Sequence, residues 1–569
     1  MQRAFLSAAR GEELADLVFR NARVVCVYTG RLIPADVGVS GGRILGMGPY
    51  EGREVVDLAG ACLAPGFIDA HVHIESSMGS VPEFARTVLP LGTTAVVADP
   101  HEIANVLGAD GINYMLETSE GLPLTVYLAL SSCVPATDME TSGARLESWD
   151  LEPFLNHPRV VALAEVMNFP GVIQGIPSVW AKIAVAKRAG KVIDGHAPGL
   201  SGLDLNAYVS AGIGSDHECT TSAEALEKIR AGMWIMIREG TGARNLDGLY
   251  PGIDQITSRR MMWCTDDRHP NSLLDEGDLD MILRRAVSRG LNPVTAITMA
   301  TLNPAEYFGL RDRGGIAPGK TADLVVLESL EHIRPCRVYC RGRLTAENGR
   351  MVPGLNMPEP ALPRRIMRIH PDGLDFTVPA LGTRIRVIQI IPDQLITGSS
   401  VEEARNEAGL AESDPGRDIL KLAVVERYTG HGRRSLGFIR GFGLRSGALA
   451  TTVAHDSHNL LVVGCEDHDM KAAARAVIEM GGGMAVADRG EIMARLPLPI
   501  AGLMSDRPLP EVSRSLEAVI SAARALGCHL EDPFMTLGFM SLPVIPSLKL
   551  TDKGLVDVER FEIVDLFVE

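Results

Sequence analysis

The sequence of 569 residues contains no apolar stretch approaching the roughly 20 residues that a membrane-spanning helix needs. Residues 1–16 carry scattered charges and no long apolar segment, which argues against a secretory signal peptide. Nine cysteines are present, but no two are spaced as Cys-x2-Cys, so the sequence does not indicate a disulfide framework. We therefore expect reduced thiols, a cytoplasmic location and no membrane partner.

Basic residues are also fewer than acidic residues. The chain has 55 lysines and arginines against 71 aspartates and glutamates, which gives a formal net charge of −16. Because nucleic-acid binding needs clustered cations that meet the phosphates, we expect no nucleic-acid partner. One short basic run, at residues 364–368, is better explained as a solvated linker than as a phosphate site.

Apolar residues, by contrast, are plentiful at 46%, and the chain length indicates about three domains. Short apolar runs punctuated by glycines occupy residues 16–62, and a similar pattern returns at 323–343. These two flanks predict one small β-domain built from both. Between them, strand-like and helix-length segments alternate over about 245 residues, which is typical of a (β/α)8 barrel. A proline-rich segment at 353–363 predicts a linker to a further domain of about 200 residues.

The predicted fold class is therefore α/β, with a TIM-type (β/α)8 barrel, a composite β-domain and a C-terminal α+β domain. The predicted segments are 1–63 and 311–362 for the composite β-domain, 64–310 for the barrel, and 363–569 for the C-terminal domain.

The most informative short pattern is His71-Val72-His73 at the end of an apolar run. Strand side chains alternate between faces, so both imidazoles point the same way and make half of a first-row metal site. Taken alone, the pair could equally be two surface or core histidines. Further residues of metal-ligand type follow later apolar runs, where a TIM-type barrel carries its chemistry: Glu165, His196, His217 and Asp266. Each alone could cap a helix, but together the six predict a metal site.

The segment Ala64–His73 resembles the first barrel strand of the amidohydrolase superfamily. Members often place a carboxylated lysine after the fourth strand, and here Glu165 occupies that position. Further runs make the chain similar to the bacterial adenine deaminases, over essentially its whole length. Those runs are 71–77, 98–105, 214–218, 265–268, 453–459 and 540–546. The C-terminal domain is the most specific of these features, since other amidohydrolase deaminases lack it.

The resemblance implies a metal-dependent hydrolase of purine salvage that deaminates adenine to hypoxanthine and ammonia. Its cofactors would be two divalent cations, Mn(II) or Fe(II) for the family, with Zn(II) also compatible. His71, His73 and Asp266 would hold one cation, His196 and His217 the other, and Glu165 would bridge them. Water acidified by the cations would attack C6, and Asp266 would carry a proton to the leaving amine.

The alternative is a deaminase or cyclic-amide hydrolase of the same superfamily that acts on another nitrogen heterocycle. In either case the expected partner is a small molecule, a purine base in the first reading. We also expect a homo-oligomer, a dimer in the simplest case.

Several polar residues at the strand ends have no ligand role. His101 and Glu102 are candidate catalytic residues, for contact with the purine nitrogens or for proton movement. Further candidates for substrate binding are Asp99, Glu75, Ser76 and Asp267. Two simpler interpretations stay open: an Asx turn at Asp99, and helix capping by Glu75 and Ser76.

The run His455-Asp456-Ser457-His458 superficially suggests a hydrolytic triad or a second metal site. Proximity in sequence does not make a triad, which is recognised by its geometry. We interpret the run as a structural or barrel-facing loop, and we expect the C-terminal domain to pack against the barrel and help shape its mouth.

Overall fold

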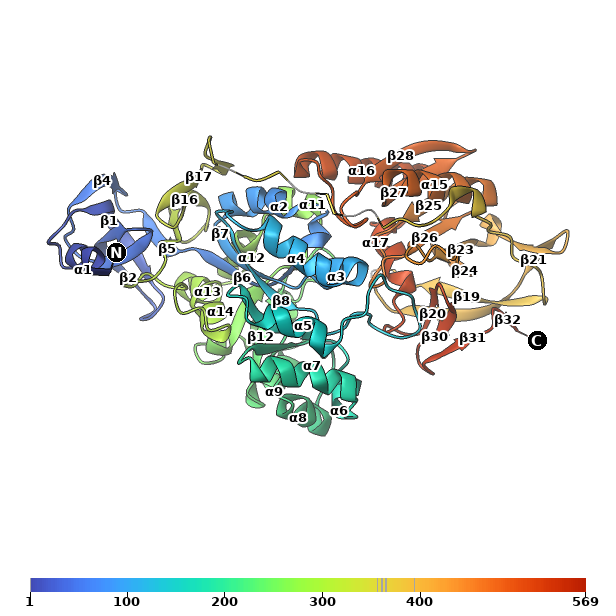
Figure 1. Ribbon diagram of the computed structural model, residues 1–569, viewed down its shortest axis with the longest axis horizontal. Coiled ribbons are helices and arrows are strands. Elements are labelled where there is room, and N and C mark those ends of the chain that lie inside the picture. Colours follow the sequence, from blue (N-terminus) through green and yellow to red (C-terminus); the bar gives the residue numbers. More distant parts are fainter. Residues whose placement is uncertain (1, 356, 360–361, 364–365, 393, 569) are drawn as a thin grey trace.

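The structure is a computed structural model that describes residues 2–355, 357–359, 362–363, 366–392 and 394–568. Three parts follow one another along its long axis: a β-domain, a barrel and a C-terminal domain (Figure 1). Parts of the predicted linker and basic run, at 356, 360–361 and 364–365, lie outside the described residues. Within the described ranges, no helix combines the length and the apolar character that crossing a membrane requires.

The β-domain joins the two flanks of the barrel in one nine-stranded sheet. Its early elements are α1 (Gln2–Ala9), β1 (Ala15–Cys26), β2 (Arg31–Ser40), β3 (Arg43–Met47), β4 (Gly52–Asp57) and β5 (Cys62–Pro65). Its late elements are β15 (Leu324–Leu327), β16 (Pro335–Cys340), β17 (Arg343–Glu347) and β18 (Arg350–Met351). The two sets meet where β5 pairs antiparallel with β15. The predicted pairing of the flanks is therefore confirmed.

The barrel contains eight parallel strands. They are β6 (Phe67–His73), β7 (Thr93–Ala98), β8 (Thr125–Leu130), β9 (Val160–Val166), β10 (Val192–Gly195), β11 (Ser215–Asp216), β12 (Trp234–Arg238) and β13 (Met261–Cys264). The last strand continues as β14 (Asp266–Asp267), which pairs with β6, so the strands form one sheet of six from β10 to β14 and one sheet of three from β11 to β13. Two details are not evident from the apolar runs of the sequence. Residues 211–214 read as one of the strand-like runs, but they are not a strand, because the chain turns at Gly212 (φ +92°) and pairs only from Ser215 onward. Conversely, residues 234–238 were not among the strand-like runs and form β12.

Helices cover the outside of the barrel (Figure 1). They are α2 (Val81–Val88), α3 (His101–Leu107), α4 (Ala109–Thr118), α5 (Ser148–Leu155), α6 (Phe169–Ile173), α7 (Pro177–Arg188), α8 (Gly202–Ser210), α9 (Ser222–Arg230), α10 (Leu246–Leu249), α11 (Pro270–Asp275), α12 (Leu279–Ser288), α13 (Pro293–Met299) and α14 (Leu302–Tyr307). On β6, Val72 belongs to the core between strands and helices. Its neighbours His71 and His73 therefore face the barrel interior, as the period of a strand predicts.

The C-terminal domain is built on a second nine-stranded sheet, mostly antiparallel. Its strands are β19 (Arg384–Ile390), β20 (Thr397–Glu403), β23 (Ile419–Val425), β24 (Arg434–Arg440), β25 (Ala448–Thr451), β26 (Leu460–Gly464), β27 (Gly483–Asp488), β28 (Glu491–Pro497) and β32 (Phe567–Val568). Smaller strands are β21 (Arg405–Glu407), β22 (Leu410–Glu412), β29 (Leu548–Thr551), β30 (Gly554–Asp557) and β31 (Glu562–Val564). The helices are α15 (Asp467–Met480), α16 (Leu509–Ala525) and α17 (Pro533–Gly538).

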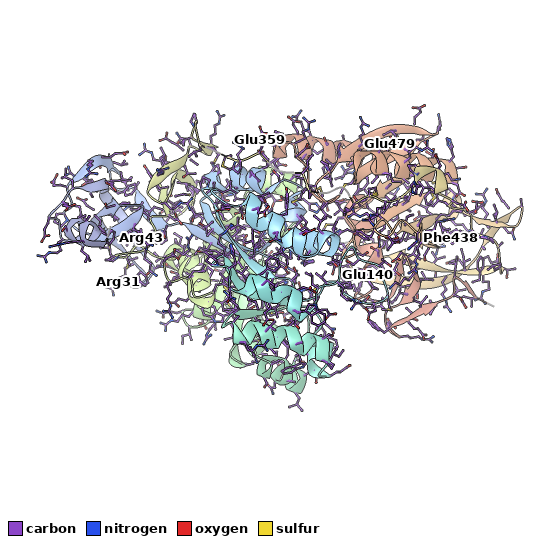
Figure 2. All side chains as sticks on the ribbon, in the orientation of Figure 1. Arg31, Arg43, Glu140, Glu359, Phe438 and Glu479 are labelled. Carbon is purple, nitrogen blue, oxygen red and sulfur yellow. The ribbon has the colours of Figure 1, made fainter. Side chains whose placement is uncertain are left out.

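The C-terminal domain packs on the end of the barrel where the strands finish, as predicted (Figure 1). Ser505 donates its backbone N–H to the Met78 carbonyl at 2.7 Å, just beyond β6. His269, just beyond β14, lies 3.2 Å from the Asp532 carboxylate at the start of α17. Glu140 marks a third contact, in the loop after β8 (Figure 2). Buried polar groups of both parts therefore meet at the mouth of the barrel.

Candidate metal centre

The six predicted ligands converge at the carboxyl ends of the barrel strands. His71 and His73 end β6, and their Nε2 atoms lie 3.1 Å apart. Asp266, which begins β14, places Oδ1 3.3 Å from His71 Nε2 and 3.2 Å from His73 Nε2. The pairing of β14 with β6 sets this arrangement, because it puts Asp266 beside Val72 in register. The first three residues thus form a compact group of two imidazoles and one carboxylate.

Glu165, near the end of β9, lies between this group and a second one. Its Oε1 is 3.5 Å from His73 Nε2, and its Oε2 is 2.8 Å from His196 Nδ1 and 3.2 Å from His217 Nε2. The rings of His71 and His217 stack at 4.3 Å between centroids, so the two groups share one space. Although burial opposes it, hydrogen bonds from His196 and His217 hold the pKa of Glu165 well below its usual range. One oxygen of the Glu165 carboxylate therefore faces His73, and the other faces His196 and His217.

The donor set fits metal ions. His73 Nδ1 lies 3.1 Å from the Asp99 carbonyl oxygen, which is the partner that fixes a proton on that nitrogen. Its Nε2 is then left with a lone pair that faces His71 Nε2 and two carboxylates. Lone pairs crowded in this way need a shared positive charge, either protons or cations. Imidazole and carboxylate together suit divalent first-row metals.

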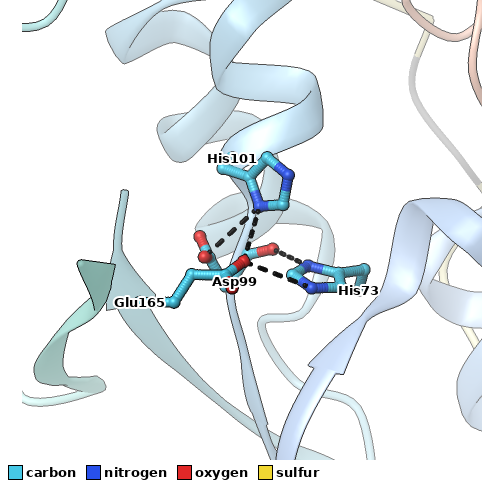
Figure 3. Close-up of side chains that lie close together, drawn as sticks. All are labelled: His73, Asp99, His101 and Glu165. Carbon is cyan, nitrogen blue, oxygen red and sulfur yellow. Dashed lines mark hydrogen bonds and ion pairs between the residues drawn. The ribbon is translucent and has the colours of Figure 1, made fainter. Parts of the chain in front are cut away.

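His101 and Asp99 lie against the same centre (Figure 3). His101 Nδ1 is 3.4 Å from Glu165 Oε1 and 3.3 Å from Asp99 Oδ2. Figure 3 shows the His73 and His101 rings turned toward the Glu165 carboxylate from different sides. The other Asp99 oxygen accepts a hydrogen bond from Ser131 Oγ at 3.1 Å. The Asp99 side chain therefore orients His101, which is more than an Asx turn would require.

The other predicted residues form two pairs: Ser76 with Asp267, and Glu75 with Glu102. Ser76 Oγ donates to Asp267 Oδ1 at 2.5 Å, which joins the ends of β6 and β14. Glu75 Oε1 accepts from the backbone N–H of Ile103 at 3.2 Å, in the first turn of α3. Glu75 thus caps the N-terminus of α3, the helix after β7, and not the helical turn that follows its own strand β6. Burial, with the nearby charges of Asp267 and Glu75, raises the pKa of Glu102 well above its usual range.

Two residues of the site were not predicted from the sequence as site residues. Glu218 Oε1 lies 3.4 Å from His217 Nε2 and 3.6 Å from His196 Nδ1. Arg238, at the end of β12, donates to both Glu218 oxygens and, at 2.9 Å, to Asp266 Oδ2. Burial opposes a charged Asp266, yet Arg238 and the neighbouring histidines hold its pKa well below its usual range. The sequence feature that could have identified Arg238 is its position directly after the apolar run 234–237.

The centre is closed on most sides. Side-chain exposure is 2% for His71 and His217 and 4% for His73 and Glu165, but 25% for His196. Solvent therefore reaches the centre beside His196 and Glu218.

Comparison with known proteins agrees with this arrangement. Residues 62–348 match the amidohydrolase family, and residues 394–562 match the adenine deaminase C-terminal domain. An adenine deaminase of Desulfatibacillum aliphaticivorans is 54% identical over 99% of both chains. Adenine deaminase 2 of Carboxydothermus hydrogenoformans is 48% identical over 98% of both, and an adenine deaminase of Kosmotoga olearia is 47% identical over 99% of this chain and 98% of its own. The chain therefore belongs to the adenine deaminases of the amidohydrolase family.

Proposed function

We propose that this protein deaminates adenine hydrolytically to hypoxanthine and ammonia, as a step of purine salvage. The observation that carries the proposal is the Glu165 carboxylate, which lies between two groups of imidazole nitrogens at the end of a barrel. The full-length relatives named adenine deaminases support the same substrate. The alternative, another nitrogen heterocycle, has no observation in its favour beyond the shared barrel.

The ligands we propose follow the two groups. His71, His73 and Asp266 would hold one divalent cation, and His196 and His217 the other. Glu165 would bridge the two. Mn(II) or Fe(II) are the proposed ions, and Zn(II) is chemically compatible with the same donors. When bound, such ions make hydroxide available near neutral pH.

Asp266 is the proposed carrier of the proton to the leaving amine. Its low pKa keeps the carboxylate ionised and able to accept a proton. Arg238 holds Oδ2, which directs Oδ1 toward His71 and His73, where the reaction would take place. Deamination moves one proton of the attacking water to the leaving amine and leaves the other on a ring nitrogen of the product, and a single well-oriented carboxylate can carry the first.

Glu102 and His101 are proposed to contact the purine ring nitrogens. Burial raises the pKa of Glu102 well above its usual range, which favours the neutral carboxylic acid, the form that can donate a hydrogen bond. A ring nitrogen that gains electron density on attack at C6 is the matching acceptor. Ser76 and Asp267, bonded to each other, would contact the ring from the side of β6 and β14.

The direct test uses the full-length protein stripped with a chelator and reloaded with Mn(II). We expect adenine to yield hypoxanthine and ammonia in equal amounts, with higher kcat/KM than on a panel of amino-heterocycles and cyclic amides. No turnover of adenine, together with turnover of another compound on the panel, would favour the alternative substrate instead.

A second test concerns the bridge. We expect two metal equivalents per chain in the wild-type protein and one or fewer in Glu165→Gln, because the bridging charge is lost. Glu331→Gln, an exposed carboxylate far from the site in sequence, is the matched control and should keep two. Full metal content in Glu165→Gln would remove Glu165 from the ligand set.

We also propose a homodimer that works in the cytoplasm. All nine cysteines are free thiols, which suits a reducing compartment. Light scattering coupled to size-exclusion chromatography should give twice the mass of one chain, and a monomer mass at micromolar concentration would contradict the dimer.

A further inference from the structure

We propose that the C-terminal domain completes the active site by supplying His455 as a positioning residue, whose Nδ1–H holds one oxygen of Glu102. The other oxygen of Glu102 is then directed to the substrate. The role given to Glu102 rests on the proposed function, whereas the contact between the two side chains does not.

The contact crosses the boundary between the barrel and the C-terminal domain. Glu102 lies in the first turn of α3, with its side chain 2% exposed, and its Oε1 is 3.3 Å from His455 Nδ1. This buried oxygen makes no aligned hydrogen bond to any described group, so the 3.3 Å contact with His455 Nδ1 becomes a hydrogen bond on a small rotation of the Glu102 carboxyl group. Leaving a buried carboxyl oxygen without a hydrogen bond costs free energy, so a nearby donor such as His455 Nδ1–H would stabilise it.

The His455 ring is held in place by its own domain. It stacks on Phe539 with 4.5 Å between ring centroids and 12° between planes, and His458 meets it edge-on at 5.5 Å. Ser541 Oγ donates to the His455 carbonyl oxygen at 3.2 Å. The imidazole is therefore oriented before any substrate binds, which is what a positioning group requires.

A third metal ion is the rival interpretation, because ligand atoms of Glu102, His455 and His458 all lie within 4.8 Å of one another. The tautomer of His458 argues against it. His458 Nδ1 accepts the backbone N–H of Ala454 at 3.2 Å, so the proton of the neutral ring is on Nε2. A metal ligand needs a lone pair at that atom. We therefore assign His458 to the structure of the loop, whereas His455 faces Glu102 of the barrel.

The directions of the two pKa shifts both favour uncharged side chains. Burial, with Asp267 and Glu75 nearby, raises the pKa of Glu102, and burial lowers the pKa of His455. A neutral carboxylic acid has one accepting oxygen and one O–H group. If His455 Nδ1–H donates to the carbonyl oxygen, the O–H group is left to donate to a ring nitrogen. No proton has to move between the two residues.

The test is His455→Ala in the full-length, Mn-loaded protein. We expect kcat to fall roughly 10- to 100-fold with little change in KM, because a misdirected donor weakens the transition state more than binding. Metal content and melting temperature should stay near wild type. Added imidazole should restore part of the rate by filling the space left by the side chain. His455→Gln, whose amide can still donate, should lose less activity than the alanine variant.

The matched control is His269→Ala. It removes the other histidine–carboxylate contact across the same boundary, His269 with Asp532 at 3.2 Å, but leaves Glu102 untouched. This variant should lower the melting temperature and show no rescue by imidazole. A double-mutant cycle adds a second comparison: in a Glu102→Gln background, His455→Ala should cost much less than it does alone.

A readout that does not depend on turnover separates this inference from the proposed function. Nitrogen-15 NMR of histidine-labelled protein should place the proton of His455 on Nδ1, and the signal should change in Glu102→Gln. If wild-type protein does not turn over adenine, the proposed function fails while this spectrum still tests the contact. Additive costs in the cycle, no rescue, and kcat falling in step with melting temperature would overturn the positioning role.

Discussion

At the scale of single residues, the stability of the metal centre depends on how its negative and positive side chains are paired. Glu165, Glu218 and Asp266 bring three carboxylates into the histidine cluster, the first and last of them buried and Glu218 partly buried, and Arg238 is the cation placed between Glu218 and Asp266. Breaking a buried ion pair costs more than a surface pair because the remaining charge stays in a poorly solvated place. Arg238 therefore stabilises the site without itself being a proposed ligand.

This balance predicts how Arg238→Met behaves. We expect the metal-free protein to lose about 3–5 kcal/mol of unfolding free energy, since the buried Asp266 and the partly buried Glu218 both lose their partner. The Mn-loaded protein should lose less, because bound cations supply positive charge nearby. Urea unfolding of both forms measures the difference. Arg244→Met, which removes a more exposed pair with Glu276, should have the same small effect in both forms. An equal loss for Arg238→Met in both forms would contradict this account.

Asp266→Asn tests the proton carrier. The amide cannot accept the proton, so we expect kcat to fall by about 10²- to 10⁴-fold while an adenine analogue still binds. The same substitution removes a proposed ligand, and metal content must therefore be measured on the assayed sample. Near-normal activity with two metal equivalents would rule out the role.

Much of this residue-level arrangement follows from the sequence. A strand side-chain period of two predicts that His71 and His73 face together, and the end of each apolar run predicts which side chains meet at the mouth. The structure brings these six residues together, while their roles as ligands stay predictions. Arg238 was missed because its strand was not recognised. Its contacts with Glu218 and Asp266 join three separate strand ends, and no local pattern shows such a contact.

At the scale of elements, β29 carries an unusual buried cation. Lys549 is 0% exposed, and its ammonium donates to the carbonyl oxygens of Leu395 and Phe539, both at 3.0 Å. Burial lowers the pKa of Lys549 to about 7. All four residues of β29 are buried, so neighbouring segments cover both of its faces. Coverage of this kind depends on tertiary packing and is not visible in the strand itself.

The shift has a defined effect of pH on stability. Between pH 7 and about 10.4, the usual lysine pKa, the unfolded chain holds a proton on Lys549 that the folded chain does not, so unfolding free energy rises with pH. The slope is up to about 1.4 kcal/mol per pH unit. Below pH 7 both states are protonated and the contribution is constant. The urea midpoint of the wild type relative to Lys549→Met should rise between pH 7 and 10. If the difference between the two urea midpoints does not change with pH, Lys549 has its usual pKa in the folded protein.

At the scale of the whole molecule, the C-terminal domain is fastened to a loop that also supports the site. The loop after β8 begins at Ser131 and Ser132, whose hydroxyls bond to the Asp99 carboxylate and, at 2.6 Å, to the Glu165 carbonyl oxygen. Farther along, the same loop is hydrogen-bonded to the turn between β29 and β30. Asp552 accepts from Thr141 N and Oγ1 at 2.7 and 2.6 Å, and Thr551 Oγ1 donates to the Met139 carbonyl at 2.6 Å.

This connection predicts the effect of Asp552→Ala. Asp552 is 1% exposed, and its loss frees two donors of Thr141 in a buried boundary. We expect amide hydrogen exchange to speed up in residues 137–146 while the sheets of both domains stay protected, because the loop opens locally. The kcat/KM for adenine should fall several-fold through Ser131 and Ser132. Asp506→Ala, an exposed carboxylate of the same domain, should change neither measurement. Faster exchange throughout the C-terminal sheet would mean that Asp552 stabilises the domain itself. Unchanged exchange in the loop would mean that other contacts hold the barrel and the domain together.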